Sequence, residues 1–250
     1  MKFLKYLALV LALFFFGCER CDEPILEVCG GNEGPPMVDL IILIDQSGSL
    51  GNIASTVSNA AAVALDSAQL DCPTDLVTHF LAVDGTWAGT LFNNSHRQFI
   101  YTAQGGIVPL ASDVAPVGFN TELGAHAIED LSNFAPWREG ACRAIFYISD
   151  EELDGSVPRG DFANETVATN AAIVSAQANE VTVFTNFITA NNLGASIMQN
   201  YDDLTGQTGG INLLSPTHTS VTEDAYIDFM PQIVCNACKA CELSQLMNAN

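Results

Sequence analysis

Two stretches of apolar residues, each ending in an aspartate, stand out along the chain. Leu40 to Ile44 follows Pro35-Pro36 and runs into Asp45, and Arg143-Ala-Ile-Phe-Tyr-Ile-Ser-Asp150 repeats the pattern further on. Apolar runs of this length between turn residues are typical of strands buried on both faces, which belong to parallel sheets. We therefore predict two buried parallel strands that each deliver a carboxylate at the carboxyl end.

Helical and extended patterns alternate along the rest of the chain. The predicted helices cover 52–70, 163–178 and 197–204, and a further one, which follows a loop that starts at 118, ends at 131. The other predicted strands cover 75–83, 181–188 and the end of 208–214. This alternation predicts an α/β fold with a doubly wound, mostly parallel sheet flanked by helices. In such folds the ligand site lies beyond the carboxyl ends of the strands, where the strand order reverses.

The loop after the first buried strand is rich in side-chain oxygen. Asp45, Ser47 and Ser49 alternate along it, and Gly48 lets the backbone turn. Oxygen ligands suit a hard divalent cation such as Mg²⁺, which keeps water in its remaining positions. The alternative is a polar turn in which Ser49 or Asn52 caps the following helix.

Asp45-x-Ser47-x-Ser49 after a buried strand resembles the first loop of the metal-ion-dependent adhesion site (MIDAS) of von Willebrand factor type A (vWA) domains. Thr121, in the loop that enters a Gly-Ala helix start, is similar to the second metal loop, and Asp150 matches the aspartate that closes the site. The resemblance spans about 37–230 and implies a Rossmann-like vWA domain. It also implies metal ligands at Asp45, Ser47, Ser49, Thr121 and Asp150.

Other segments match or depart from the family pattern. The run Tyr201 to Gly210 again resembles the family, which would also place a short antiparallel edge strand at 97–102. One extra residue separates Thr121 from Gly124, so that Thr121 could instead be a helix N-cap, and Glu151-Glu152 stands where the family has glycine.

The resemblance implies a binding module rather than an enzyme. Mg²⁺ is the expected cofactor, with Ca²⁺ or Mn²⁺ as alternatives, and an acidic side chain of a protein partner would complete the metal shell. One alternative is a secreted metal-assisted hydrolase with Glu151 or Glu152 as its base. Another is a structural envelope lipoprotein with a vestigial metal site. We expect His79, His126 and His218 to be structural or surface residues.

Charge and the amino-terminal segment bear on partners and location. A formal net charge of −21 excludes a nucleic-acid-binding role. Residues 1–17 read as a signal peptide, because two lysines precede the apolar run Tyr6–Phe16, which is too short to span a bilayer. Gly17-Cys18 resembles a bacterial lipobox, which implies a lipid on Cys18, a membrane-anchored tether over 18–36 and an outer-membrane lipoprotein. The alternative is plain secretion.

The cysteines are predicted to form disulfides at the pole opposite the metal loops. Cysteines that precede strands are expected at that pole. The segment 231–250 is expected to form a final helix that ends there, with Pro231 in its first turn. In an oxidising compartment clustered cysteines favour disulfides, with a zinc or redox site as the alternative. The candidates are Cys21, Cys29, Cys72, Cys142, Cys235, Cys238 and Cys241, in a connectivity that spacing leaves open.

Overall fold

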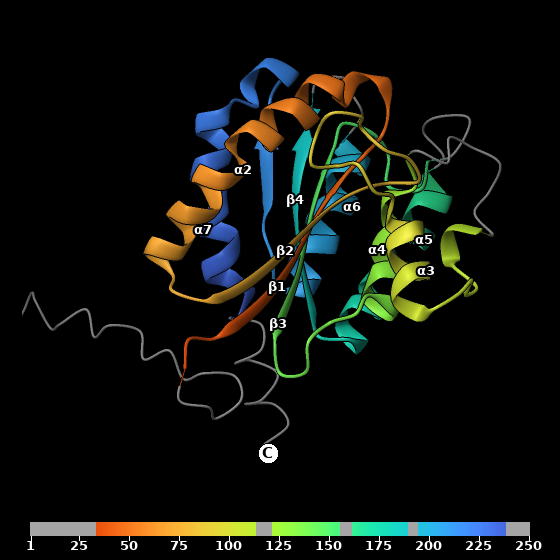
Figure 1. Ribbon diagram of the computed structural model, residues 1–250. Coiled ribbons are helices and arrows are strands. Elements are labelled where there is room, and N and C mark those ends of the chain that lie inside the picture. The colour runs from red at the N-terminus through yellow and green to blue at the C-terminus, as the bar shows by residue number, and fades with distance from the viewer. Residues whose placement is uncertain (1–33, 114–121, 156–161, 190–194, 239–250) are drawn as a thin grey trace, which may run out of the picture.

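The protein folds around one parallel sheet (Figure 1). The structure is a computed structural model that describes residues 34–113, 122–155, 162–189 and 195–238. Over these residues the strands lie in the order β2-β1-β3-β4-β5, and each neighbouring pair is parallel. The strands are β1 (Met37–Ile44), β2 (Asp75–Ala82), β3 (Cys142–Ser149), β4 (Val181–Ile188) and β5 (Asn212–Ser215). The predicted doubly wound α/β fold is therefore confirmed.

Helices cover both faces of the sheet. On one face lie α2 (Gly51–Asp71) and α7 (Glu223–Ala237), and on the other lie α3 (His96–Gln104), α4 (Gly124–Phe134), α5 (Phe162–Ala178) and α6 (Ala195–Thr208) (Figure 1). The buried face of α2 consists largely of alanines, which let the helix approach the sheet and α7 closely. Two apolar clusters result, one on each side of a sheet whose central strands are almost wholly buried.

The strand order reverses between β1 and β3. From β1 the chain moves outward to β2, and then crosses back to place β3 on the other side of β1. Ile44 pairs with Ile148, and the Asp45 amide donates a hydrogen bond to the Ile148 carbonyl over 3.0 Å. The loops after β1 and β3 therefore leave the sheet side by side, at the position where doubly wound folds bind ligands.

The expected antiparallel edge strand at 97–102 is wrong, because this segment lies within helix α3. Ser95 caps the helix by accepting a hydrogen bond from the Gln98 amide over 3.2 Å, and Gly105 ends it in the left-handed conformation with φ 70°. These two capping signals outweigh the short alternating pattern between them. Consequently the sheet is wholly parallel over the described residues, and β2 forms its edge.

The last helix, α7, begins eight residues before Pro231. Thr222 caps it by accepting from the Ala225 amide, and Glu223 and Asp224 occupy the first turn, where negative charge is favourable. Pro231 thus lies inside the helix, not in its first turn as expected. A continuous α7 places Met230 and Ile233 on the same buried face.

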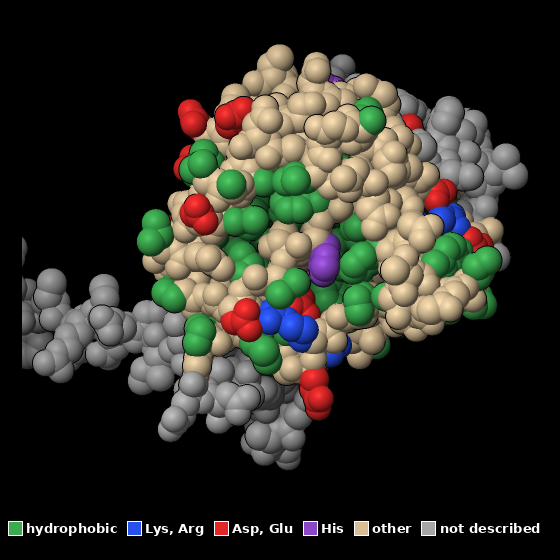
Figure 2. All heavy atoms as spheres, viewed as in Figure 1, with side chains coloured by type: hydrophobic (Ala, Val, Ile, Leu, Met, Phe, Trp, Pro, Cys, Tyr) green, Lys and Arg blue, Asp and Glu red, His purple; other side chains and the backbone are tan. Residues whose placement is uncertain are grey.

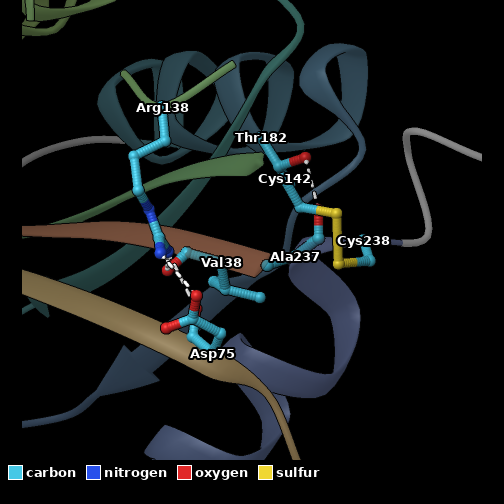
Figure 3. The surroundings of a disulfide bond; sticks show 7 residues. All are labelled: Val38, Asp75, Arg138, Cys142, Thr182, Ala237 and Cys238. Atoms are coloured by element: carbon cyan, nitrogen blue, oxygen red, sulfur yellow. Dashed lines mark hydrogen bonds and ion pairs between the residues drawn. A yellow bond between two sulfur atoms is a disulfide. The ribbon is translucent and has the colours of Figure 1, made fainter. Parts of the chain in front are cut away.

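Two disulfides attach α7 to the end of the sheet at which the strands begin. They join Cys72 to Cys235 and Cys142 to Cys238. Figure 3 shows the second bridge beside Thr182, whose hydroxyl donates to the Ala237 carbonyl. The prediction that cysteines fasten the carboxyl-terminal helix to the strand bases is confirmed for these four. Cys18, Cys21, Cys29 and Cys241 lie outside the described residues, as do the signal peptide and most of the tether.

An ion-pair cluster ties the starts of β1 and β2 together. Arg138 donates to Asp39 over 2.6 Å. It also donates to Asp75 over 2.8 Å and to the Val38 carbonyl over 3.1 Å (Figure 3). Hydrophobic side chains reach the surface on this side of the molecule (Figure 2), where a small hollow is lined by His79, Phe99 and Trp137 among others. This hollow is separate from the loops at the carboxyl ends of the strands.

Candidate functional site

The carboxylate of Asp45 is fixed by the loop after β1 and by the last residue of β3. Its Oδ1 accepts a hydrogen bond from the Ser47 amide over 2.5 Å, and its Oδ2 accepts one from the Ser149 hydroxyl over 2.9 Å. The indole nitrogen of Trp87 donates to the Asp45 carbonyl over 3.2 Å. The residue is completely buried, so its orientation is determined by these contacts.

Two serine hydroxyls connect Asp45 to the second strand-end carboxylate. The Ser47 hydroxyl lies 3.2 Å from Asp45 Oδ2 and 2.9 Å from the Ser49 hydroxyl. Ser49 in turn donates to Asp150 Oδ1 over 3.0 Å, and Ser47 lies 3.5 Å from the same oxygen. The structure therefore brings together four of the predicted site residues, with Ser49 exposed and the two carboxylates buried.

Thr121, the remaining predicted ligand, lies outside the described residues. Its neighbour Glu122 is buried, and its charge reaches Asp45. The start of α4 is held against the loop that follows β3, because the Ala125 amide donates to the Leu153 carbonyl over 2.7 Å. Gly124 is needed at this start, since a Cβ there would lie 2.5 Å from the Tyr147 ring.

A fourth loop reaches the site from β5. His218 lies in the short 3₁₀ helix His218–Ser220, and its Nε2 is 2.8 Å from Asp150 Oδ2. Sequence reasoning treated His218 as a structural or surface residue and missed this contact. One signal was present: the polar run Ser215-Pro-Thr-His-Thr-Ser220 follows a strand that is parallel to β1 and β3, so it leaves the sheet at the same end.

Buried negative charge dominates the electrostatics of the site. Burial raises the pKa of Asp45 well above its usual value, and the nearby Asp150 and Glu122 carboxylates add to the rise, while hydrogen bonds from Ser47 and Ser149 oppose it. An ionised Asp45 is thus unfavourable in this surrounding unless positive charge is near it. A bound cation would supply that charge.

The acidic residues after Asp150 turn into the protein. Glu151, Glu152 and Asp154 are buried, and the Glu151 carbonyl accepts a hydrogen bond from Tyr201 over 2.8 Å. Burial is the main cause that raises the pKa of the nearby Glu165 to about 7, and the charges of Glu152 and Asp154 add to the rise. The Glu165 carboxylate accepts a hydrogen bond from the Leu153 amide and so helps to hold the loop that follows β3.

His96 and His79 have structural surroundings. His96 is fully buried, accepts from the Asp84 amide at Nδ1 over 3.1 Å, and lies 3.4 Å from the Ser112 hydroxyl. Burial lowers its pKa to about 3. With Nδ1 occupied by a backbone donor, His96 cannot act as a base toward Ser112. His79 packs against Phe99 with ring centroids 4.8 Å apart.

The donor set fits a hard cation better than a soft one. Among the described residues, no group of three or more His, Cys, Asp and Glu side chains is arranged to hold a metal ion. Asp45 and Asp150 instead share their surroundings with Ser47 and Ser49, and carboxylate with hydroxyl oxygens suits Mg²⁺, Ca²⁺ or Mn²⁺. Asp45, Ser47, Ser49 and Asp150 are the described residues that could hold such an ion.

The fold and the converging loops define a doubly wound α/β protein with an oxygen-rich cluster at the switch point of its sheet. No protein-family model matches the sequence, and comparison with curated proteins returns no match. Solved structures do match. A D319A mutant of the PilB minor pilin from Streptococcus sanguinis has a TM-score of 0.46 at 8% identity, with 82% of this chain covered. The alignment spans 63% of the pilin chain.

A second similar structure is the conserved hypothetical protein BatB from Bacteroides thetaiotaomicron. It has a TM-score of 0.38 at 18% identity, and the alignment covers 77% of this chain and 98% of that one.

Proposed function

We propose that this protein is an exported, vWA-type binding module that holds a divalent cation in a MIDAS-like site. The observation that supports it best is the hydroxyl-linked pair of strand-end carboxylates: Ser49 donates to Asp150 across a separation of 101 residues, and Ser47 connects Ser49 to Asp45. Only the reversal of strand order between β1 and β3 brings these oxygens together.

Each residue has a distinct part in this proposal. Asp45 and Asp150 supply the negative charge, while Ser47 and Ser49 supply neutral oxygens that leave much of a cation's charge unquenched. When bound, Mg²⁺ would act as a Lewis acid toward an incoming carboxylate. Ser49 is exposed, so the loop that carries it can meet a partner. By the family resemblance, Thr121 would complete the set of ligands.

The net charge favours a cation-dependent encounter. A formal charge of −21 repels an acidic partner over the whole surface, and a carboxylate of that partner can approach these loops only where the local charge is offset. We therefore expect binding of an acidic protein ligand to require the divalent cation and to be lost on chelation.

Export is supported by the two disulfides. Stable disulfides form in oxidising compartments, and both bridges described here lie at the pole opposite the candidate site, where they leave its loops unconstrained. We propose that the chain reaches the bacterial envelope through residues 1–17 and is anchored by a lipid on Cys18. Within the described ranges, no helix has the length and apolar character needed to cross a bilayer.

Calorimetric titration of the metal-free protein with Mg²⁺ tests the binding site. We expect one Mg²⁺ per chain, no binding in Asp45→Ala, and unchanged binding in Asp66→Ala, which removes an exposed carboxylate from α2. Absence of binding in both the wild type and Asp45→Ala would show a vestigial site. Equal binding in the two proteins would show that the ion binds away from Asp45.

Intact-mass measurement of the membrane-extracted protein tests the anchor. A diacylglyceryl adduct on a chain that starts at Cys18 is expected. A soluble chain with unmodified Cys18 would show plain secretion instead.

A further inference from the structure

The loop after β5 holds His218 in a defined position. Asn186 on β4 donates to the Ser215 hydroxyl over 2.9 Å, which fixes the end of β5. Thr217 and Ser220 then form a reciprocal capping box around the 3₁₀ turn, in which the Thr217 amide donates to the Ser220 hydroxyl over 3.2 Å. His218 is the first residue of that turn. The backbone is therefore held on both sides of His218.

The ring of His218 contacts Oδ2 of Asp150, whereas the two serines contact Oδ1. Ser49 and Ser47 contact Oδ1, whereas His218 Nε2 lies 2.8 Å from Oδ2. The Asp150 side chain is completely buried, and that of His218 is 31% exposed. The carboxylate of Asp150 is thus held from two sides by loops that follow β1 and β5.

We propose that His218 is a positioning residue for the metal site. By donating its Nε2 hydrogen to Asp150 Oδ2, it fixes the plane of the carboxylate and keeps Oδ1 turned toward the serine hydroxyls. Loss of this contact removes one restraint on rotation of the carboxylate about χ2, and such a rotation would move Oδ1 relative to Ser49. The metal role rests on the proposed function, while the His218–Asp150 contact itself does not.

The chemistry of imidazole suits this role. A neutral imidazole donates one hydrogen bond without a permanent positive charge, whereas lysine or arginine at the same place would repel a cation bound nearby. Hydrogen-bond partners that orient metal ligands are typically worth about 10- to 100-fold in metal affinity. His218 therefore contributes to affinity without being a ligand.

Metal affinity in matched variants separates positioning from general stability. Mn²⁺ titrations, read by the electron paramagnetic resonance signal of the free ion, are expected to show about tenfold weaker binding in His218→Ala. His218→Gln should recover most of the loss, because its side-chain amide can donate in place of Nε2. His79→Ala, which removes a ring packed against Phe99, should bind as the wild type does.

Melting temperatures of the metal-free proteins test the contact independently. His218→Ala should lower the melting temperature in the wild-type background and should have no further effect in an Asp150→Ala background. Equal shifts in both backgrounds would overturn the contact.

The outcomes also separate this inference from the proposed function. A wild type that binds Mn²⁺ with His218→Ala unchanged overturns the positioning role alone. A wild type that binds neither Mn²⁺ nor Mg²⁺ overturns the proposed function and the metal role of His218 together, whatever the melting temperatures show.

Discussion

The Ser49 hydroxyl donates a hydrogen bond to Asp150 Oδ1 over 3.0 Å, and this contact joins loops that follow two neighbouring parallel strands. Ser49 is exposed whereas Asp150 is buried, so the contact lies where a buried charge meets the surface. A change at Ser49 should therefore affect what the site binds more than how firmly the chain folds.

Substitution of this serine separates binding from stability. We expect Ser49→Ala to lower the free energy of unfolding by about 1 kcal/mol or less, the usual net value of one hydrogen bond. Mg²⁺ affinity should fall about tenfold, equivalent to about 1.4 kcal/mol. Chemical denaturation and calorimetry measure the two effects. Ser55→Ala, which removes a hydroxyl bonded within α2, serves as the control. An unchanged Mg²⁺ affinity in Ser49→Ala would contradict the assignment.

Loss of the Cys142–Cys238 bridge should weaken the fold but spare the site. The bridge joins residues 96 positions apart, and removal of such a link typically costs about 2–5 kcal/mol. The Cys142→Ser/Cys238→Ser variant should thus unfold at lower denaturant concentration. Its Mg²⁺ affinity should match the wild type, because β3 runs for eight residues, about 25 Å, between the bridge and the site. Weakened Mg²⁺ binding in folded protein would show that the two poles are coupled.

Two glycines near the end of α6 should respond oppositely to alanine. A Cβ at Gly210 would lie 1.9 Å from the Val183 carbonyl oxygen, so the backbone of β4 would have to move. We expect Gly210→Ala to lower the free energy of unfolding by about 3 kcal/mol. Gly206 lies inside the same helix with open space around its Cα, and Gly206→Ala should raise stability by up to about 1 kcal/mol. Similar stabilities of the two variants would contradict the close packing of Gly210 on β4.

Glu165 should make stability depend on pH. Its pKa is raised from 4.5 to about 7, so the folded state favours the protonated form. The resulting stabilisation is fully present below pH 4.5 and is lost as the pH rises through 7. At about 1.4 kcal/mol per pH unit, the loss amounts to about 3 kcal/mol.

Glu165→Gln, which mimics the protonated side chain, should remove this dependence. Denaturation of both proteins in chelator between pH 4.5 and 8 gives the difference, in which groups common to both cancel. Parallel stability curves for the two proteins would show that the Glu165 carboxyl has no raised pKa in the folded state.

Local pattern predicts elements well where burial and capping agree. The β4 strand was expected at 181–188 and is found there, since its eight residues are all buried. The family resemblance failed at α3: it implied an edge strand at 97–102, whereas Ser95 and Gly105 cap a helix there. Local pattern failed at α7, where Pro231 suggested a start that Thr222 and its acidic neighbours in fact mark.

The sequence alone determined that two buried strands each end in a carboxylate, and that serines follow the first of them, because burial and turn chemistry act over a few neighbouring residues. It also predicted cysteines at the opposite pole, which is confirmed for the four cysteines of the two described bridges. Only the tertiary structure decided which oxygens meet, that His218 joins Asp150, and that Cys72 and Cys142 pair with Cys235 and Cys238. Contacts between distant segments depend on strand order and register, which no local pattern carries.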